Sequence, residues 1–183
     1  MTEQYNPNSF HARTVDRENK RNWICNEISS STASWCAVTL TLKQDCFVDE
    51  YYEKLTPMKC EDIIGDYLHR LNSHFYRNAY RRKNKRLSNI PAIERGKKGN
   101  LHIHLLLEIP DYMEADPYVF SDQLKQIWHK SVWAMERIDV QFCKNRAGGA
   151  PGWATYITKD LLKDENALCI AHMKLPETSN SVH

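Results

Sequence analysis

The run Asn100–Pro110 constrains the fold of this chain most strongly, because two histidines alternate in it with aliphatic residues. Side chains two positions apart leave the same face of a β-strand. A strand over this run therefore sets His102 and His104 side by side on one face and packs the aliphatic residues on the other. Two imidazoles held on a rigid strand are a ready pair of metal ligands. The alternative is that each is an ordinary polar residue of a half-buried strand.

Glu94 offers a third ligand. It follows a short apolar run, Ile90–Ile93, which predicts a neighbouring strand, and it lies eight residues before His102. The connection 95–100 is rich in Gly and Lys, as hairpin loops often are. Folding this hairpin brings the carboxylate beside the two histidines. One carboxylate and two imidazoles suit a hard or borderline divalent ion, so we predict Mn²⁺ or Mg²⁺ as the cofactor.

Tyr156 and Lys159 lie in a segment, 152–163, that predicts a helix after the glycine-rich turn 146–152. Three residues apart, the two side chains share one helix face. A tyrosine beside a cation is a candidate nucleophile toward phosphorus, because the cation stabilises the charged phenolate. The alternative is a buried aromatic on an amphipathic helix.

Three motifs, in this order, resemble those of the HUH endonucleases, in particular the small Rep proteins that initiate rolling-circle replication. Thr39–Leu42 is similar to the first motif of that family. His102–His104 is similar to its His-hydrophobe-His metal motif, and Glu94 stands where many Rep proteins have a third ligand. Tyr156–Lys159 is similar to the Tyr-x-x-Lys motif of the single-tyrosine class. The resemblance covers about residues 35–165.

The resemblance implies an α+β fold, with a central antiparallel β-sheet, flanking helices, a central histidine strand and the tyrosine helix beside it. It also implies a metal-dependent endonuclease that nicks and joins single-stranded DNA and so initiates rolling-circle replication of a plasmid, phage or virus. Glu94, His102 and His104 would hold the metal. Tyr156 would attack phosphorus to form a 5′-phosphotyrosine link, and Lys159 would offset the added negative charge. The helix carries no second tyrosine, so termination would need another protomer or another acceptor.

Hydrophobic periodicity predicts the same architecture independently. The order β-α-β-β-α-β-α favours an antiparallel sheet with helices on one face. The expected strands are 35–43, 90–94, 100–109 and 138–142, the expected helices are 59–83, 116–132 and 152–163, and 44–57 is expected to be a loop.

One domain is expected for 183 residues with 42% hydrophobic content. We predict a nuclease domain at 23–170, a flexible polar arm at 1–22 and a disordered tail at 171–183. No apolar run approaches the roughly 20 residues that span a bilayer, and the polar N-terminus does not read as a signal peptide. We therefore expect a cytoplasmic protein. The six cysteines form no Cys-x-x-Cys pair, which disfavours a zinc ribbon.

Basic residues crowd the segment 77–98, nine of them against one acid. Tyrosines interleave with them and the predicted metal hairpin is adjacent in sequence, so we predict that the segment binds DNA phosphates. The alternative is a solvated helix end. On the first strand Thr39 and Thr41 share a face, and they are either substrate contacts or plain β-formers. The predicted DNA-binding residues are Thr39, Thr41, Arg77, Arg81, Arg82, Lys83, Lys85, Arg86, Lys97 and Lys98.

Two rival functions stay open at this point. A four-stranded α+β sheet with exposed aromatics and a basic loop can bind single-stranded nucleic acid, including RNA, without catalysis. A transposase or relaxase of a mobile element would use the same chemistry for another biological purpose. The chain has no Walker pattern and hence no fused helicase of that type. The expected partners are single-stranded DNA and a host helicase, without a membrane, for a monomer or weak dimer.

Overall fold

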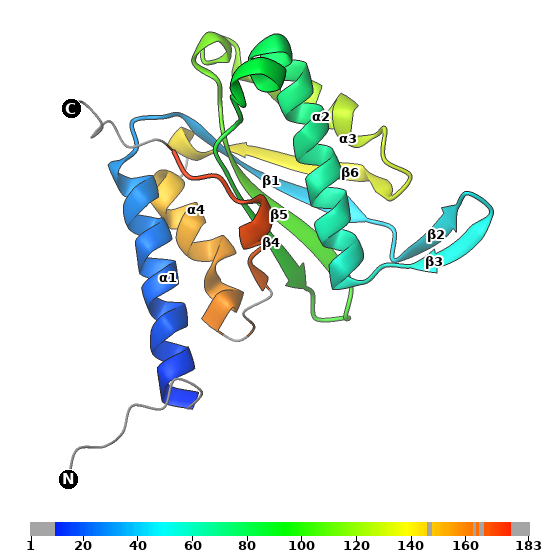
Figure 1. The fold of residues 1–183 in the computed structure, drawn as a ribbon, viewed down its shortest axis with the longest axis horizontal. Helices are drawn as coiled ribbons and strands as arrows, with labels where there is room; N and C mark the ends of the chain where they lie inside the picture. The colour runs from blue at the N-terminus through cyan, green and yellow to red at the C-terminus, as the bar shows by residue number, and fades with distance from the viewer. Residues whose placement is uncertain (1–9, 146–147, 163, 165–166, 177–183) are drawn as a thin grey trace.

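The computed structural model describes residues 10–145, 148–162, 164 and 167–176 (Figure 1). No helix within these ranges is long and apolar enough to cross a bilayer. The α-helices are α1 (Phe10–Ser30), α2 (Pro57–Lys83), α3 (Pro117–Trp128) and α4 (Gly149–Ile157), and the strands are β1 (Trp35–Leu42), β2 (Asp45–Val48), β3 (Tyr51–Lys54), β4 (Asn89–Arg95), β5 (Leu101–Glu108) and β6 (Ala134–Phe142). Short 3₁₀ helices are η1 (Asp111–Met113), η2 (Cys143–Asn145), η3 (Lys159–Leu162) and η5 (Ile170–His172).

Four strands form one antiparallel sheet in the order β4-β5-β1-β6. The histidine strand β5 is therefore internal, paired with β4 on one side and β1 on the other. The predicted α+β class and the predicted strands are confirmed, with β6 beginning four residues earlier than the alternating pattern indicates.

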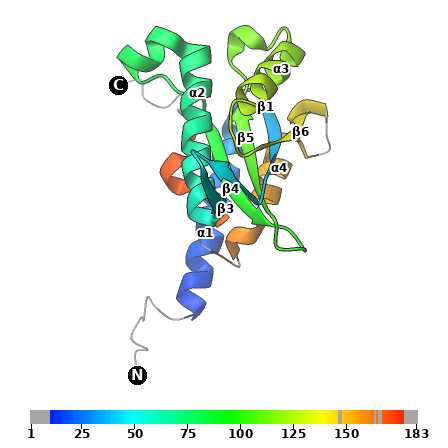
Figure 2. The same cartoon turned by 90° about the vertical axis from the view of Figure 1, so that its right-hand side faces the viewer.

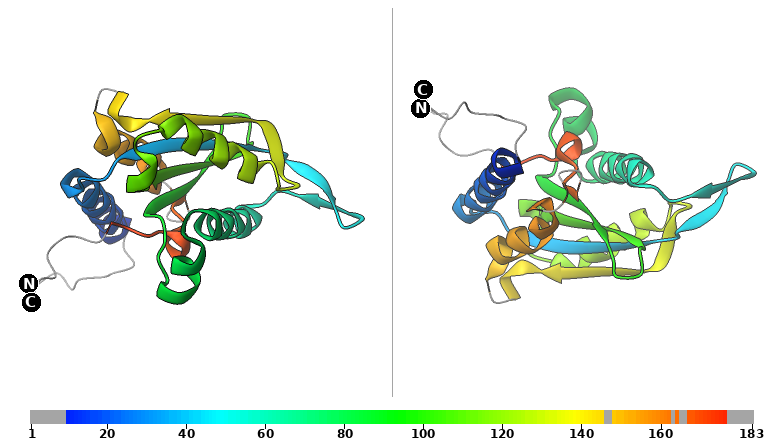
Figure 3. Two further views of the ribbon diagram at one scale, coloured as in Figure 1. Left: turned by 90° about the horizontal axis from the view of Figure 1, so that it is seen from above. Right: turned by 90° about the horizontal axis from the view of Figure 1, so that it is seen from below.

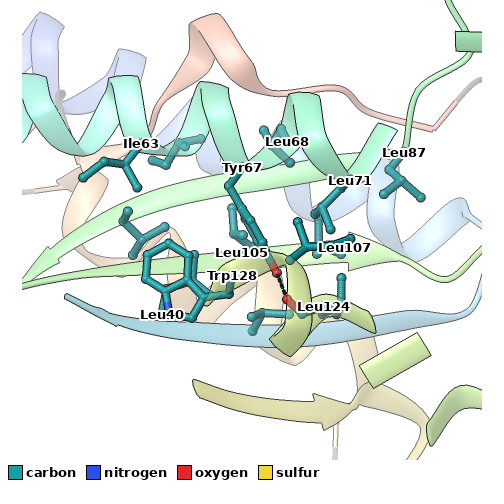
Figure 4. Packing of buried hydrophobic residues seen from close by; sticks show 14 of the residues in the cluster. Leu40, Ile63, Tyr67, Leu68, Leu71, Leu87, Leu105, Leu107, Leu124 and Trp128 are labelled. Carbon is teal, nitrogen blue, oxygen red and sulfur yellow. Dashed lines mark hydrogen bonds between the residues drawn. The ribbon is translucent and has the colours of Figure 1, made fainter. Parts of the chain in front are cut away.

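One face of the sheet packs against α2 and α3. Leu40 and Ile103 are fully buried there, and Tyr67 of α2 donates a hydrogen bond to the Leu124 carbonyl of α3 at 3.0 Å (Figure 4). Tyr67 and Trp128 also meet edge to face, with ring centroids 5.5 Å apart. Each fully buried aliphatic side chain contributes about 1.5–3 kcal/mol to folding, so this layer holds the histidine strand in place.

The opposite face also carries helices, which corrects the expected one-sided arrangement. α1 and α4 lie next to each other and apart from α2 in both views of Figure 3. The physical reason is visible in the strands. Near one end of the sheet β1 and β5 have consecutive apolar residues, which is the pattern of strands buried on both faces. Trp35, Ala37 and Leu106 pack with Ala154 and Ile157 of α4 in this second cluster.

Helix α1 occupies much of the segment expected to be a flexible arm, so that expectation is wrong from residue 10 onward; residues 1–9 lie outside the described residues. Its polar sequence hides a short stripe. Ile24 and Ile28, one turn apart, are each only 1% exposed and join the second cluster. Two buried residues are enough to dock the last turns of the helix on the sheet but give little periodicity to detect.

The expected loop 44–57 is instead a β-hairpin, β2–β3, which projects from the body of the molecule (Figure 1). Its turn residues Asp49 and Glu50 both have positive φ, 46° and 73°. Two positive-φ residues match the twist of paired strands. The turn was missed because Asp-Glu lacks the glycine that normally signals such a hairpin.

Helix α2 follows the prediction closely. Thr56 caps it by accepting a hydrogen bond from the Lys59 amide at 3.2 Å, and Pro57 occupies the first turn. The helix ends at Asn84, which has a left-handed φ of 52°. Arg77 is not helical (φ 44°), and Figure 2 shows the last turns leaving the direction of the preceding ones. The start of α3 is also confirmed, because Asp116 accepts from the Val119 amide.

The C-terminal segment runs along the free edge of β4. Lys174 and Asn89 exchange two backbone hydrogen bonds of 2.6 and 3.0 Å, and the Cys169 amide donates to the Pro91 carbonyl. Covering an edge strand in this way blocks pairing with other chains. The expected disordered tail at 171–183 is thus ordered over 171–176, while 177–183 lies outside the described residues. The limits of the nuclease domain stay a prediction.

Candidate functional site

The β4–β5 hairpin brings the predicted metal ligands to one face of the sheet. Glu94 is the cross-strand partner of His102, and Ala92 is the partner of His104. Because paired residues share a face and alternate residues repeat it, all three polar side chains stand on the same side. This arrangement follows the one expected from the 95–100 connection.

Glu94 and His104 are in direct contact. Oε2 of Glu94 and Nε2 of His104 lie 2.5 Å apart. The other ring nitrogen, Nδ1, lies 3.1 Å from Oγ1 of Thr39 on the neighbouring strand β1. Thr39 thereby fixes the ring so that Nε2 faces the carboxylate. A bond from the second nitrogen is also what orients imidazoles in metal sites.

Tyr156 and Lys159 join this pair from the other side. Nζ of Lys159 lies 2.8 Å from Oε1 of Glu94 and 3.8 Å from the centroid of the Tyr156 ring. The rings of Tyr156 and His104 meet edge to face at 6.0 Å. Tyr156 is 43% exposed, so it is not the buried aromatic of the alternative interpretation. The structure therefore brings Glu94, His104, Tyr156 and Lys159 into one cluster, although 65 residues separate Glu94 from Lys159.

The charges of the cluster support each other. Burial raises the pKa of Glu94, but the Lys159 hydrogen bond and the charges of His104 and Lys159 outweigh it and lower the pKa below its usual value. Burial lowers the pKa of His104, and the neighbouring Glu94 only partly offsets this, so the net shift is downward. For Lys159, burial is outweighed by hydrogen bonds to Glu94 and Tyr156, which raise the pKa. The favoured state is an ionised carboxylate, a neutral imidazole and an ammonium ion.

His102 stands apart from the contacting pair. A Cβ atom at Gly96 would lie 3.7 Å from Nε2 of His102, so the ring lies against the turn between β4 and β5. Within the described ranges, no three His, Cys, Asp or Glu side chains gather around one point as a metal cluster. The chemistry of the donors nevertheless fits a divalent ion. A carboxylate oxygen and an imidazole nitrogen converge on one position, and a second imidazole shares their face.

Gln44 was missed by the sequence analysis. Its side chain accepts from the Leu101 amide at 2.8 Å and donates to the Leu101 carbonyl at 3.1 Å, while its own backbone carbonyl accepts from the Leu55 amide. The amide group thus replaces a strand partner at the first residue of β5, next to His102. A lone glutamine after a strand carries no signal of such a role.

The basic residues fall on two separate surfaces. Lys97 and Lys98 lie in the β4–β5 turn, beside the cluster. The other basic residues lie at the end of α2, which leads into the opposite end of β4. The strand from Asn89 to Glu94 spans about 17 Å, so the expected adjacency to the metal hairpin is wrong for this group. Stacking of Lys85 on Tyr76 and of Arg86 on Tyr80 accompanies them.

A cleft of about 790 Å³ lies at this basic end, not at the cluster around Glu94. Lys83, Lys85 and Arg86 line it together with the acids Glu108 and Glu114. Size alone does not identify a reaction centre. The cleft has charges of both signs but no nucleophile in contact with an ion pair, whereas the Glu94 cluster has both. We therefore place the candidate site at the cluster.

Comparison with known proteins is consistent with the motif order. The sequence model of a family described as replication-associated protein ORF2 matches residues 35–165. No curated protein matches the sequence. Among solved structures, the N-terminal nuclease domain of minute virus of mice non-structural protein 1 resembles the chain at 11% identity and a TM-score of 0.33, covering 93% of this chain and 75% of that one. That domain is described as having a Zn²⁺ site in its active-site pocket and as recognising DNA at the origin of replication.

Proposed function

The chain belongs to the replication-associated protein ORF2 family of rolling-circle Rep nucleases, and on that premise we propose that it nicks and rejoins single-stranded DNA through Tyr156. The observation that carries the proposal is the position of Lys159. Its ammonium group contacts the Glu94 carboxylate and the Tyr156 ring at once. A candidate nucleophile and a candidate metal-ligand pair thus share one cation.

The proposed reaction is a transesterification. The Oη–P bond to Tyr156 forms while the P–O3′ bond of the DNA breaks; the phenol gives up its proton, and O3′ ends as a hydroxyl. Lys159 stabilises the developing phenolate and the negative charge on the phosphate. Tyr156 is half exposed, so a strand can approach it from solvent.

Glu94, His104 and His102 would hold the divalent ion. The ion supplies Lewis-acid polarisation of the scissile phosphate when bound. Thr39 orients His104 for this role through Nδ1, and Lys159 keeps Glu94 ionised. Mn²⁺ and Mg²⁺ are the ions that a set of one carboxylate and imidazoles suits at a phosphate-binding centre.

A single tyrosine limits each site to one covalent transfer. The next tyrosines along the chain are engaged elsewhere: the Tyr112 hydroxyl donates to the Phe75 carbonyl, and Tyr118 packs against Phe142. Rejoining the strand therefore takes the phosphotyrosine link of one protomer and a 3′-hydroxyl as acceptor, while a second cleavage takes the tyrosine of another protomer. A host helicase would supply the unwinding that the chain itself shows no motif for.

The basic residues are assigned to two DNA contacts. Lys97 and Lys98 in the hairpin turn would bind the strand next to the scissile phosphate. Arg81, Arg82 and their neighbours at the end of α2 would bind phosphates farther along the DNA, because they stand at the opposite end of the sheet. Both contacts are sequence-independent and salt-sensitive.

The direct experiment is incubation of the protein with a panel of single-stranded oligonucleotides and Mn²⁺, followed by a denaturing gel. A protein band shifted by covalently attached DNA is the expected result. Nicking without any covalent adduct contradicts the tyrosine mechanism. Binding without nicking or adduct, under any metal and oligonucleotide, favours the non-catalytic module. A transposase or relaxase would give the same adduct, and the DNA recognised, an element end or transfer origin, would identify it.

A further inference from the structure

The sheet face that carries the Glu94 cluster is covered by helices over only part of its length. α4 packs on Trp35, Ala37 and Leu106, toward one end of β1 and β5. Toward the other end the same face continues with polar residues, most of them only partly buried. These residues are Glu94 on β4, His102 and His104 on β5, Thr39 and Thr41 on β1, and Asp139 on β6.

Asp139 ends this polar row. It is the cross-strand partner of Thr39, which is in turn the partner of His104. Paired residues share a face, so Asp139 and His104 stand on the same side of the sheet, two strands apart. With neighbouring strands about 4.8 Å apart, their backbones are separated by about 10 Å. A strand held at the cluster therefore reaches Asp139 within about two nucleotides.

The Asp139 carboxylate is held in place. Nε2 of Gln141, two residues along β6 on the same face, donates a hydrogen bond to Oδ2 of Asp139. No basic side chain neutralises this carboxylate among the ion pairs of the described residues. A fixed negative charge beside a DNA path repels phosphates, so it favours an arrangement in which a base, not the backbone, faces β6.

The chemistry of a carboxylate selects among the bases. An ionised aspartate only accepts hydrogen bonds, and its two oxygens accept a parallel pair of donors best. The bases of a single strand expose their Watson–Crick edges. Guanine alone presents two adjacent donors there, N1–H and the N2 amino group. Adenine and cytosine place an acceptor beside their amino group, and thymine flanks one N–H with two carbonyls.

We propose that Asp139 reads a guanine within about two nucleotides of the scissile phosphate, through the N1–H and N2 amino group of its Watson–Crick edge. The proposal rests on the proposed function, because it takes the cluster as the place where the strand is held. It names the specificity of that site. Asp139 acts here as a base-reading residue, distinct from the groups that contact the phosphate.

The test separates base reading from nicking by working in EDTA, where cleavage does not enter. A single-stranded DNA library of random sequence is bound to the wild type, to Asp139→Asn and to Glu136→Gln, and the retained DNA is sequenced. Glu136 is an exposed acid on the same strand, so it is a matched loss of one charge. The wild type and Glu136→Gln should enrich one guanine position, and Asp139→Asn should lose that enrichment alone.

Base analogues at the selected position sharpen the test. Inosine lacks the N2 amino group, so wild-type affinity should fall about tenfold, the effect of one hydrogen bond to a charged group. 7-Deazaguanine keeps the Watson–Crick edge and should bind like guanine. For Asp139→Asn, guanine and inosine should bind alike. Guanine enrichment that survives in Asp139→Asn, or no enriched guanine in the wild type, overturns the proposal. Adduct formation in Mn²⁺ without this preference overturns it alone, and the preference without any adduct overturns only the nicking function.

Discussion

Thr39 has a more definite task than a residue on a DNA-binding surface. The sequence left open whether it contacts substrate or is only a β-former, and its hydroxyl instead bonds Nδ1 of His104. This contact crosses from β1 to β5, and only the strand register creates it. Residue spacing along the chain carries no sign of it.

We predict that Thr39→Val weakens metal binding, because valine keeps the shape but leaves the His104 ring unanchored. The expected loss in Mn²⁺ affinity is about ten- to a hundredfold, the range for removing such an orienting group. Calorimetric titration with Mn²⁺ measures it. Thr39→Ser keeps the hydroxyl and should restore most of the affinity. Equal affinities for valine and wild type would show that Thr39 only fills the sheet.

The ligand set gives a second residue-scale prediction. Chelation should abolish nicking, and Mn²⁺ or Mg²⁺ should restore it. His102→Ala should still bind DNA but nick it at least roughly a hundredfold more slowly, the scale of losing a well-placed electrostatic contribution. Nicking rates and filter binding of the same oligonucleotide measure the two properties separately. Full activity in excess chelator contradicts the metal assignment.

At the scale of elements, regular periodicity made α2, α3, β1, β4 and β5 predictable, and caps such as Thr56 and Asp116 marked two helix starts. α1 and the β2–β3 hairpin were missed for physical reasons. The helix buries only a narrow stripe, and the hairpin turn has no glycine. The glycine-rich connection in β4–β5, by contrast, predicted the hairpin that pairs Glu94 with His102.

Gln44 links two of these elements, and its removal should be felt in both. Gln44→Ala leaves the Leu101 amide and carbonyl without their partner, so the free energy of unfolding should fall by about 1–3 kcal/mol. Urea denaturation measures this. Hydrogen exchange at Leu101 and Leu55 should accelerate, since both amides depend on Gln44. An unchanged midpoint together with unchanged exchange would mean that the contact does not hold β5.

The end of α2 should contribute salt-dependent DNA affinity. Each phosphate contact to a single strand contributes about −0.7 to the log–log slope of affinity against salt, so Arg81→Ala with Arg82→Ala should flatten it by roughly one to one and a half units. Lys125→Ala with Lys130→Ala removes two charges elsewhere and serves as the control. A slope unaltered by the α2 variant identifies the group as a solvated helix end.

At the scale of the whole molecule, one sheet has two differently used faces. One face is covered by α2 and α3 and holds the strands in register. The other is partly covered by α1 and α4 and partly open, and the cluster lies where cover ends. The contact of Lys159 with Glu94 depends on α4 packing over β5 and β1. Sequence motifs named the members of this cluster, but only the packing of α4 brings them together.

The central claim is that Tyr156 forms the covalent link to DNA, and peptide mass mapping of the trapped adduct tests it most directly. The nucleotide should map to Tyr156. Tyr156→Phe removes only a half-exposed hydroxyl, so it should cost little stability, abolish the adduct and leave DNA binding nearly intact. Lys159→Ala should slow adduct formation without abolishing it. A nucleotide on Tyr112, Tyr118 or any other residue, or an undiminished adduct with Tyr156→Phe, contradicts the account.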